Sequence, residues 1–373
     1  MNAKILLLAD ANSPHTLRWA VSIKNSGYSI GIFCFHKIDE SLYINFKNIQ
    51  LYSLNISRSL QSASEDNFSK IVYLKAVKKV KTIIKEFKPE IVHAHYASSY
   101  GLIGALSGFH PLIISMWGSD IFRFPNYSIL HKTILKFNLS RADKLLSTSY
   151  KMKSETKKYT NKDIVVTPFG VDVNRFKPKI VNSIFEQDEI IIGTIKTLEN
   201  IYGIEYLIKA FQIVKNKLPQ KRIKLLLVGE GTQRKRFEEL AAELNLLSDI
   251  IFTGYINHNE VENYHNMLDI YVAVSLQESF GVAVLEASAC AKPVIVSNVG
   301  GLPEVVDDGK TGIIIEKENP NQLADALLKL IINPDLRSEM GSNGRQKVLN
   351  EFDWQDSLKK MLNIYNDCLN KSF

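Results

Sequence analysis

The segment that decides the fold is Glu278-Ser-Phe-Gly-Val-Ala-Val-Leu-Glu286, where two carboxylates stand eight positions apart around a Ser-Phe-Gly corner. An apolar stretch at 270–274 precedes it and predicts a strand, so Glu278 follows the carboxyl end of that strand. In open α/β sheets, ligands bind at this end of the strands. The residues after Glu278 predict the start of a helix, whose first N–H groups favour anions or polar oxygens.

The two carboxylates suit a ligand with many hydroxyl groups. Glu286 lies about two helical turns after the corner and can face the same crevice as Glu278. No cation stands beside either residue in the sequence, and carboxylates accept hydrogen bonds from the hydroxyls of a sugar or a ribose. The alternative is that both are solvated charges at a helix terminus, with Glu278 acting only as a partner of the helix dipole.

This segment and several others resemble the retaining glycosyltransferases of family 4, which have the GT-B fold and a Glu-x7-Glu motif in their C-terminal domain. The stretches at 168–172, 228–231, 252–254 and 287–304 also resemble sequences of this family. The resemblance implies transfer of a hexose or N-acetylhexosamine from a nucleotide-sugar, with UDP favoured, to a glycan or lipid-linked acceptor. It also implies retention of the anomeric configuration and a place in bacterial surface polysaccharide synthesis, such as that of lipopolysaccharide.

The resemblance also assigns candidate residues. Glu286 would bind the ribose hydroxyls, Glu278 and the amides after it would hold the donor sugar, and His95 would be the active-site histidine near that sugar. The implied donor-binding residues are Thr197, Gly229, Ile256, Ser279, Phe280, Gly281, Val282 and Glu286. The chain has no Asp-x-Asp sequence, so we expect neither a metal nor a cofactor. The implied chemistry is front-face attack, in which a departing phosphate oxygen takes the acceptor proton.

One departure from the family concerns the residues that hold the donor diphosphate. The family usually offers an Arg and a Lys where this chain has Thr197 and Tyr202. Lys196 is the nearest cation and is the candidate catalytic substitute, the alternative being a surface lysine after a strand. Charge develops on the leaving diphosphate, so loss of both cations would remove a large stabilising interaction. A non-catalytic glycan-binding scaffold and a nucleotide-sugar epimerase of the same shape therefore remain as alternatives.

The N-terminal half offers further candidates. His93 and His95 come at the end of a predicted strand, and we expect their side chains to point to opposite sides, which argues against a metal pair. Asp120 follows the next strand and either orients an acceptor hydroxyl or caps the following turn. The acceptor-side candidates near the N-terminus are His15, Thr16 and Arg18, in a segment that Ser13-Pro14 could simply open as a helix.

Alternation of strands and helices predicts an α/β protein with two doubly wound, Rossmann-like parallel sheets. We expect strands at residues 4–9, 29–35, 91–93, 112–115, 144–147 and 164–167 in the first domain, and at 190–195, 224–228, 250–253, 270–274, 293–297 and 312–315 in the second. The predicted domains, 1–178 and 184–354, face each other across a cleft as in the GT-B fold. A C-terminal helix at 355–373 is expected to cross back to the first domain.

Charge is divided unevenly along the chain. Residues 1–180 hold 26 Lys and Arg against 12 Asp and Glu, a net of +14, whereas residues 181–373 hold 20 against 27, a net of −7. Part of the excess lies on one predicted amphipathic helix, which carries Lys75, Lys78, Lys79 and Lys85. It is either an ordinary surface helix or one attracted to an anionic membrane surface. No basic-aromatic ladder accompanies the charge, so no nucleic-acid partner is expected.

Composition and cysteine usage favour a cytoplasmic protein. The three cysteines, Cys34, Cys290 and Cys368, have neither disulfide nor zinc spacing and favour a reducing compartment. The first apolar run is too short for a signal peptide and is expected to form the first strand. A content of 45% hydrophobic residues over 373 positions is enough for two cores. We expect a cytoplasmic enzyme that can be peripheral at the inner face of the cell membrane.

Overall fold

The computed structural model describes residues 3–46, 48–56 and 70–370. The chain divides into an N-terminal unit, Met1–Pro168 with Ser357–Phe373, and a C-terminal unit, Phe169–Asp356. The return of the last helix to the first unit agrees with the sequence-based expectation. The division falls before the polar stretch at 178–189, which belongs to the C-terminal unit.

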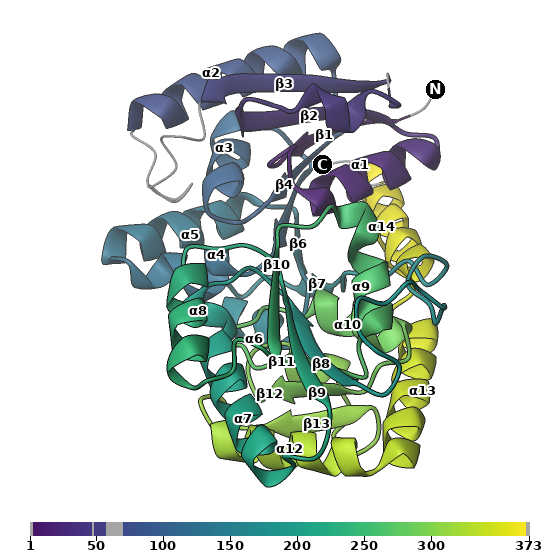
Figure 1. Cartoon of the computed structure of the whole chain (residues 1–373). Coiled ribbons are helices and arrows are strands. Elements are labelled where there is room, and N and C mark those ends of the chain that lie inside the picture. The colour runs from purple at the N-terminus through teal and green to yellow at the C-terminus, as the bar shows by residue number, and fades with distance from the viewer. Residues whose placement is uncertain (1–2, 47, 57–69, 371–373) are drawn as a thin grey trace. The chain divides into compact units, whose positions relative to one another are not determined.

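The N-terminal unit is built on a seven-stranded parallel sheet with the order β3-β2-β1-β4-β5-β6-β7 (Figure 1). Its strands are β1 (Lys4–Leu8), β2 (Ser29–His36), β3 (Ile49–Ile56), β4 (Ile91–His95), β5 (Leu112–Met116), β6 (Lys144–Ser147) and β7 (Ile164–Val166). Most are short apolar runs that helices bury on both faces, as parallel sheets require. The edge strand β3 was not predicted, because polar residues such as Gln50, Ser53 and Asn55 interrupt its apolar pattern.

The helices of this unit are α1 (Pro14–Asn25), α2 (Lys70–Phe87), α3 (Ser99–Ser107), α4 (Ser119–Phe122), α5 (Ile129–Arg141), α6 (Tyr150–Thr156) and the greater part of α14 (Trp354–Leu369). Ser13 is the N-cap of α1 and Pro14 its first residue, where the missing proline N–H costs nothing. Helix α2 buries Ala76, Val80 and Ile83 in the core. The four lysines singled out on this helix are exposed.

The C-terminal unit is built on a six-stranded parallel sheet with the order β10-β9-β8-β11-β12-β13. Its strands are β8 (Ile190–Ile195), β9 (Ile223–Val228), β10 (Ile250–Gly254), β11 (Ile270–Ala273), β12 (Val294–Ser297) and β13 (Gly312–Ile315). The helices are α7 (Ile204–Lys217), α8 (Arg234–Glu243), α9 (Val261–Met267), α10 (Val282–Ala289), α11 (Leu302–Val305), α12 (Pro320–Ile332) and α13 (Pro334–Glu351). One apolar core, which includes Phe211, Leu225 and Leu327, joins α7 and α12 to the sheet.

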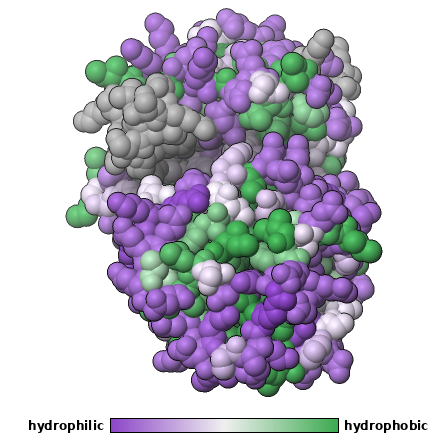
Figure 2. Space-filling model, viewed as in Figure 1, coloured by the Kyte–Doolittle hydropathy of each residue, from purple (hydrophilic) through white to green (hydrophobic). Residues whose placement is uncertain are grey.

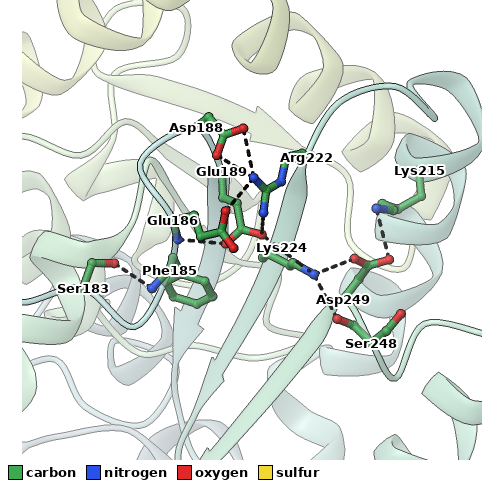
Figure 3. Close-up of polar contacts among 10 residues, drawn as sticks. All are labelled: Ser183, Phe185, Glu186, Asp188, Glu189, Lys215, Arg222, Lys224, Ser248 and Asp249. Atoms are coloured by element: carbon green, nitrogen blue, oxygen red, sulfur yellow. Dashed lines mark hydrogen bonds and ion pairs between the residues drawn. The ribbon is translucent and has the colours of Figure 1, made fainter.

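A network of charged side chains closes the amino-terminal edge of this second sheet (Figure 3). Arg222, just before β9, lies 2.7 Å from Glu186 and 2.8 Å from Asp188, which lie just before β8. Lys224 continues the network to Asp249, before β10, with 3.0 Å between Nζ and Oδ1. These pairs fix the end of the polar stretch, at residues 186–189, to the strands of its own unit, at the edge opposite to the one where ligands bind.

Within the described residues, no helix is long and apolar enough to cross a membrane. On the face shown in Figure 2, hydrophilic residues predominate and hydrophobic residues gather in separate patches between them.

Candidate active site

The order of strands in the C-terminal unit creates a switch point between β8 and β11. β8 pairs with β9 on one side and with β11 on the other, so the connections that leave β8 and β11 run to opposite sides of the sheet. Parallel sheets bind ligands at this position, beyond the carboxyl ends of the two strands. Lys196 is the first residue after β8, and Glu278 lies in the loop after β11.

Lys196 and Glu278 form a mostly buried ion pair. The Nζ of Lys196 lies 2.6 Å from Oε2 of Glu278, and the two side chains are 14% and 13% exposed. The ring of Tyr202 faces the ammonium, with 4.9 Å between Nζ and the ring centroid. Burial alone would lower the pKa of Lys196, but the negative charge of Glu278 outweighs it and the pKa is raised. The lysine therefore stays protonated across the physiological pH range.

Two glycines allow the backbone to hold this pair. Gly300 has φ +55°, and a Cβ at this position would overlap the carbonyl oxygen of Glu278. The N–H of the next residue, Gly301, donates to that oxygen at 3.3 Å. Gly229 has φ +137°, and a Cβ there would overlap the carbonyl oxygen of Lys196. Glycine tolerates a positive φ and has no Cβ to overlap a carbonyl oxygen. The loops after β9 and β12 can therefore approach closely and fix the positions of the two charged residues.

Glu286 lies on α10, the helix that follows the Glu278 loop. Its side chain is 12% exposed, and its Oε2 is 3.5 Å from Nε2 of His265, which is fully buried. The ring of Tyr271 packs against His265, with 5.4 Å between centroids. Burial raises the pKa of Tyr271 to about 12, so its phenol is neutral. Sequence reasoning missed His265, which lies in the largely polar helix α9, and Tyr271, which lies within an apolar strand, because neither segment has a motif that indicates a site.

The start of α10 lies where the sequence predicted a helix N-terminus. The helix begins at Val282, and Gly281, with φ +112°, is its N-cap. Ser279 lies in the loop before it. The ring of Phe280 is buried against Phe169 and Phe352, at centroid distances of 6.3 and 5.9 Å. Phe280 can therefore offer a ligand its backbone N–H but not its side chain.

The remaining donor-side candidates follow neighbouring strands of the same sheet. Thr197 is exposed beside Lys196, Gly229 follows β9, and Ile256 is half-buried in the loop after β10. The carboxyl ends of β8, β9 and β10 share one edge of the sheet, so these residues lie on the side of the sheet that carries Glu278. Tyr202 stands where the resemblance expects a lysine, and its ring contacts the lysine that the chain does have.

The N-terminal unit has a switch point of its own, between β1 and β4. His95, the last residue of β4, stacks on Trp117 at a centroid distance of 4.3 Å. His15, at the start of α1, meets the same indole edge-on at 6.2 Å. Burial, assisted by the neighbouring His93 and His15, holds the pKa of His95 well below its usual value. His95 is therefore a neutral imidazole at physiological pH.

The expectation that His93 and His95 point to opposite sides was wrong. Their ring centroids are 4.8 Å apart, because residues two positions apart in a strand share one face. His93 has both ring nitrogens engaged, Nδ1 with the hydroxyl of Tyr365 and Nε2 with that of Ser115, each at 2.7 Å. Burial lowers its pKa to about 3. His93 joins β4 to α14 within the N-terminal unit.

The other N-terminal candidates lie on two different elements. Asp120 is fully buried, and its carboxylate accepts hydrogen bonds from the N–H groups of Ala97 and Gly118, at 2.7 and 2.8 Å. Both donors precede Asp120 in the chain, so these bonds fix the loops after β4 and β5 and not, as the capping alternative expected, the turn that follows Asp120. Thr16 is buried and Arg18 is partly buried, both in the first turns of α1. A group of three or more His, Cys, Asp or Glu suited to a metal ion is absent from the described residues.

Comparisons with known proteins give the family of the chain. The model of glycosyl transferases group 1 matches residues 176–347, and that of glycosyl transferase 4-like proteins matches residues 4–149. An uncharacterised glycosyltransferase from Methanocaldococcus jannaschii is 30% identical over 304 residues, which are 80% of this chain and 82% of that protein. The chain belongs to the family 4 glycosyltransferases.

Two further proteins bear on this glycosyltransferase. N-acetyl-alpha-D-glucosaminyl L-malate synthase from Bacillus anthracis is 26% identical over 75% of each chain. HepE from Anabaena, solved in complex with UDP-glucose, superposes with a TM-score of 0.78 over 98% of this chain and 99% of that one. At 18% identity, the likeness to HepE shows a common GT-B fold.

Proposed function

We propose that this glycosyltransferase transfers a hexose or N-acetylhexosamine from a nucleotide-sugar to a glycan or lipid-linked acceptor, with retention of the anomeric configuration and without a metal. The observation that carries the proposal is the Lys196–Glu278 pair at the switch point of the C-terminal unit, followed by Glu286 on the next helix. A bacterial surface polysaccharide is the product that fits this acceptor class.

Each part of the donor has a proposed partner in the C-terminal unit. Glu286 accepts hydrogen bonds from the ribose hydroxyls, and His265 behind it limits the positions that its carboxylate can take. Glu278, with the N–H groups at the start of α10, holds the sugar hydroxyls. UDP is the favoured nucleotide, and HepE, which was solved with UDP-glucose, supports it. The similarity to N-acetyl-alpha-D-glucosaminyl L-malate synthase supports an N-acetylhexosamine as one of the two proposed classes of donor sugar.

Lys196 is the proposed partner of the diphosphate. It is protonated and is held at the switch point by a single carboxylate. Donor binding would give the ammonium a second anionic partner, and the bond to Glu278 would weaken as the bond to phosphate formed. Glu278 would then be free to accept hydrogen bonds from the sugar. This exchange makes one lysine serve the place where the family usually has two cations.

The proposed reaction is a front-face displacement. The bond between the anomeric carbon and the diphosphate oxygen breaks, and the acceptor oxygen forms its bond to the same face of that carbon. The departing phosphate oxygen takes the acceptor proton, so no side-chain base is needed. Lys196 stabilises the negative charge that develops on the diphosphate, and this stabilisation is greatest in the transition state. The positive charge of the lysine serves this purpose without a metal.

The roles of the N-terminal residues stay predictions. His95 is a neutral imidazole, which donates one hydrogen bond and accepts another and so suits a sugar hydroxyl better than a phosphate. His15, Thr16 and Arg18 remain the acceptor-side candidates. Asp120 is the weakest of them, because backbone N–H groups already occupy its carboxylate.

A donor screen tests the proposal. The purified protein is incubated with UDP- and GDP-sugars, with and without a lipid acceptor extract, and the products are measured by mass spectrometry. We expect consumption of a UDP-sugar and a mass gain of one sugar on an acceptor, with an α-linkage from an α-donor by NMR. Interconversion of the donor without acceptor would show an epimerase instead. A donor that stays intact in every mixture would show a glycan-binding scaffold.

A further inference from the structure

Helix α5 (Ile129–Arg141) exposes a second apolar face that the core does not use. Its inner face packs Leu135 and Leu139 into the core of the N-terminal unit. On the outside, Ile129 is 86% exposed, Leu130 is 62% exposed and Phe137 is 40% exposed. Large apolar side chains that are exposed together on one helix are characteristic of an interaction surface, whereas single exposed apolar residues are common on any protein surface.

The exposed residues of α5 form two adjacent rows. Residues four positions apart lie on one side of a helix, so Ile129, Thr133 and Phe137 form one row, which ends in Arg141. Lys132, Lys136 and the exposed Ser140 form the neighbouring row, and Leu130, seven positions before Phe137, lies on the same side of the helix as Phe137. All of these side chains except Thr133 and Ser140 are apolar or cationic. The outer face is therefore an apolar strip with positive charge along one side and at its carboxyl end.

The segment that contains α5 has no acidic residue of its own, and Asp143, the next acid along the chain, accepts a hydrogen bond from the N–H of Leu112. Between residues 121 and 142 the chain has Arg123, Lys132, Lys136 and Arg141 but neither Asp nor Glu. In the part of the chain that the structure describes, none of these four cations forms an ion pair. Lys132 instead lies over the ring of Tyr159, 6.0 Å from its centroid. A partner that covers this face would have to be apolar at its centre and anionic around it.

We propose that the outer face of α5 docks onto an anionic lipid surface, with Ile129, Leu130 and Phe137 inserted between the lipids and the four cations at the level of the headgroups. Apolar side chains flanked by lysines and arginines are the pattern of helices that lie in the membrane interface. The N-terminal half as a whole, with its net charge of +14, favours the same surface.

Helix α2 is the alternative candidate for this contact. Its exposed face carries the lysines at positions 75, 78, 79 and 85, and Ile71 and Leu74, in its first two turns before these lysines, are 64% and 69% exposed. The four lysines attract anionic lipids through their charge, which salt screens over about 8 Å at physiological ionic strength. Variants of the two helices therefore differ in a measurable way: reversal of the α2 lysines removes only charge, whereas loss of the α5 apolar residues removes a part of the binding that salt does not screen.

Vesicle sedimentation of the full chain tests the proposal without donor or acceptor, so its outcome is independent of the glycosyl transfer. The wild type is compared on phosphatidylglycerol–phosphatidylcholine vesicles and on pure phosphatidylcholine vesicles, at low and high salt. We expect binding to the anionic vesicles, weaker but measurable at high salt. The triple variant Ile129→Ser, Leu130→Ser, Phe137→Ser should partition into the vesicles at least about tenfold less than the wild type. Burial of even one aliphatic or aromatic side chain contributes about that factor.

Matched variants separate the alternatives. The variant Lys132→Glu, Lys136→Glu should lose its preference for anionic vesicles. The control Ile184→Ser, Leu247→Ser, Ile332→Ser removes aliphatic side chains of similar exposure from the C-terminal unit and should bind like the wild type. Reversal of the four α2 lysines to Glu should weaken binding less than the α5 triple variant at high salt. Stronger loss from the α2 variant than from the α5 variant at high salt would overturn the proposal.

A direct measure of insertion keeps the proposal testable if a variant folds poorly. Ile129→Trp places one exposed indole on α5, whereas the natural tryptophans, at positions 19, 117 and 354, are buried. Its fluorescence should be quenched by brominated lipids in anionic vesicles. Absence of quenching would overturn the proposal, as would a dimer in light scattering that the α5 triple variant abolishes, since that result assigns the face to a second copy of the chain.

Discussion

Lys196 and Glu278 lie 82 residues apart in the sequence, yet their charged atoms are 2.6 Å apart. They meet because β8 and β11 are neighbours in the sheet and the loops after both strands begin at the same edge. The ammonium of Lys196 at the ligand-binding edge is therefore neutralised by the same carboxylate that is proposed to hold the sugar.

The first prediction concerns removal of the negative partner. Glu278→Gln should bind UDP more tightly than the wild type, by about three- to tenfold, because the ammonium of Lys196 no longer has to exchange a charge-assisted bond. Sugar transfer should fall by about a hundredfold. Calorimetry with UDP and single-turnover assays measure the two effects. Asp188→Asn, which removes a partner of Arg222 at the other edge of the sheet, should change neither. Weaker UDP binding in Glu278→Gln would refute the exchange.

The second prediction concerns the cation itself. Lys196→Ala should lower kcat more than it lowers donor affinity, because charge on the diphosphate is greatest in the transition state. Steady-state kinetics beside calorimetric donor affinities measure the difference. Lys217→Ala, which removes an exposed lysine paired with Asp325, is the control. Activity equal to the wild type would place the diphosphate contact elsewhere.

The third prediction concerns Glu286. Glu286→Ala should weaken donor binding by ~1.5–3 kcal/mol, since the ribose hydroxyls lose a charged hydrogen-bond acceptor. The loss should be much smaller for a pyrophosphate probe, which has no ribose. Titration of UDP and pyrophosphate into both proteins gives the comparison. Donor affinity that does not change would remove Glu286 from the binding site.

The fourth prediction concerns the dependence of stability on pH. His93 has a folded-state pKa of about 3, below its unfolded value of about 6.5, so between these values the unfolded chain binds more protons than the folded one. Its contribution to stability is present above pH ~6.5 and is lost at up to ~1.4 kcal/mol per pH unit as pH falls toward 3. Thermal melts from pH 7 to 4 should show a shallower decline for His93→Gln. Parallel curves would contradict the assignment.

The fifth prediction compares two glycines with positive φ. Gly300→Ala should be severely destabilising and inactive, because its Cβ would overlap the carbonyl oxygen of Glu278. Gly309 has φ +73° and no atom within 4 Å of the Cβ position, so Gly309→Ala should cost only the conformational strain of about 1 kcal/mol. Melting temperatures and turnover of the two variants measure the difference. Similar losses in both would mean that strain alone, not the Glu278 loop, decides the cost.

The strands were largely predictable because buried parallel strands are continuous apolar runs. Those at 144–147, 190–195 and 312–315 begin and end at the predicted residues. The edge strand β3 was missed, since an edge strand is half-solvated and its polar residues break the run. The start of α10 was predictable from the Ser-Phe-Gly corner, because glycine tolerates the positive φ that the N-cap residue Gly281 adopts there.

The side-chain contacts of the site were much less predictable. The Lys196–Glu278 bond depends on which strands become neighbours, and sequence spacing does not contain that information. The contacts of His265 with Glu286 and of Asp120 with Ala97 likewise join separate elements. His93 and His95 were misplaced for a different reason: the period of a strand puts residues two apart on one face, so here the sequence did contain the answer.

The pairing of Lys196 with Glu278 at the ligand-binding edge has a consequence for product inhibition. After transfer, the nucleoside diphosphate would be held by one ammonium whose resident partner, Glu278, competes with the phosphate to reclaim it. Re-formation of the 2.6 Å ion pair would therefore assist departure of the product. The enzyme should tolerate an excess of UDP over its sugar donor, and its turnover should be limited by the chemical step rather than by release of the nucleotide.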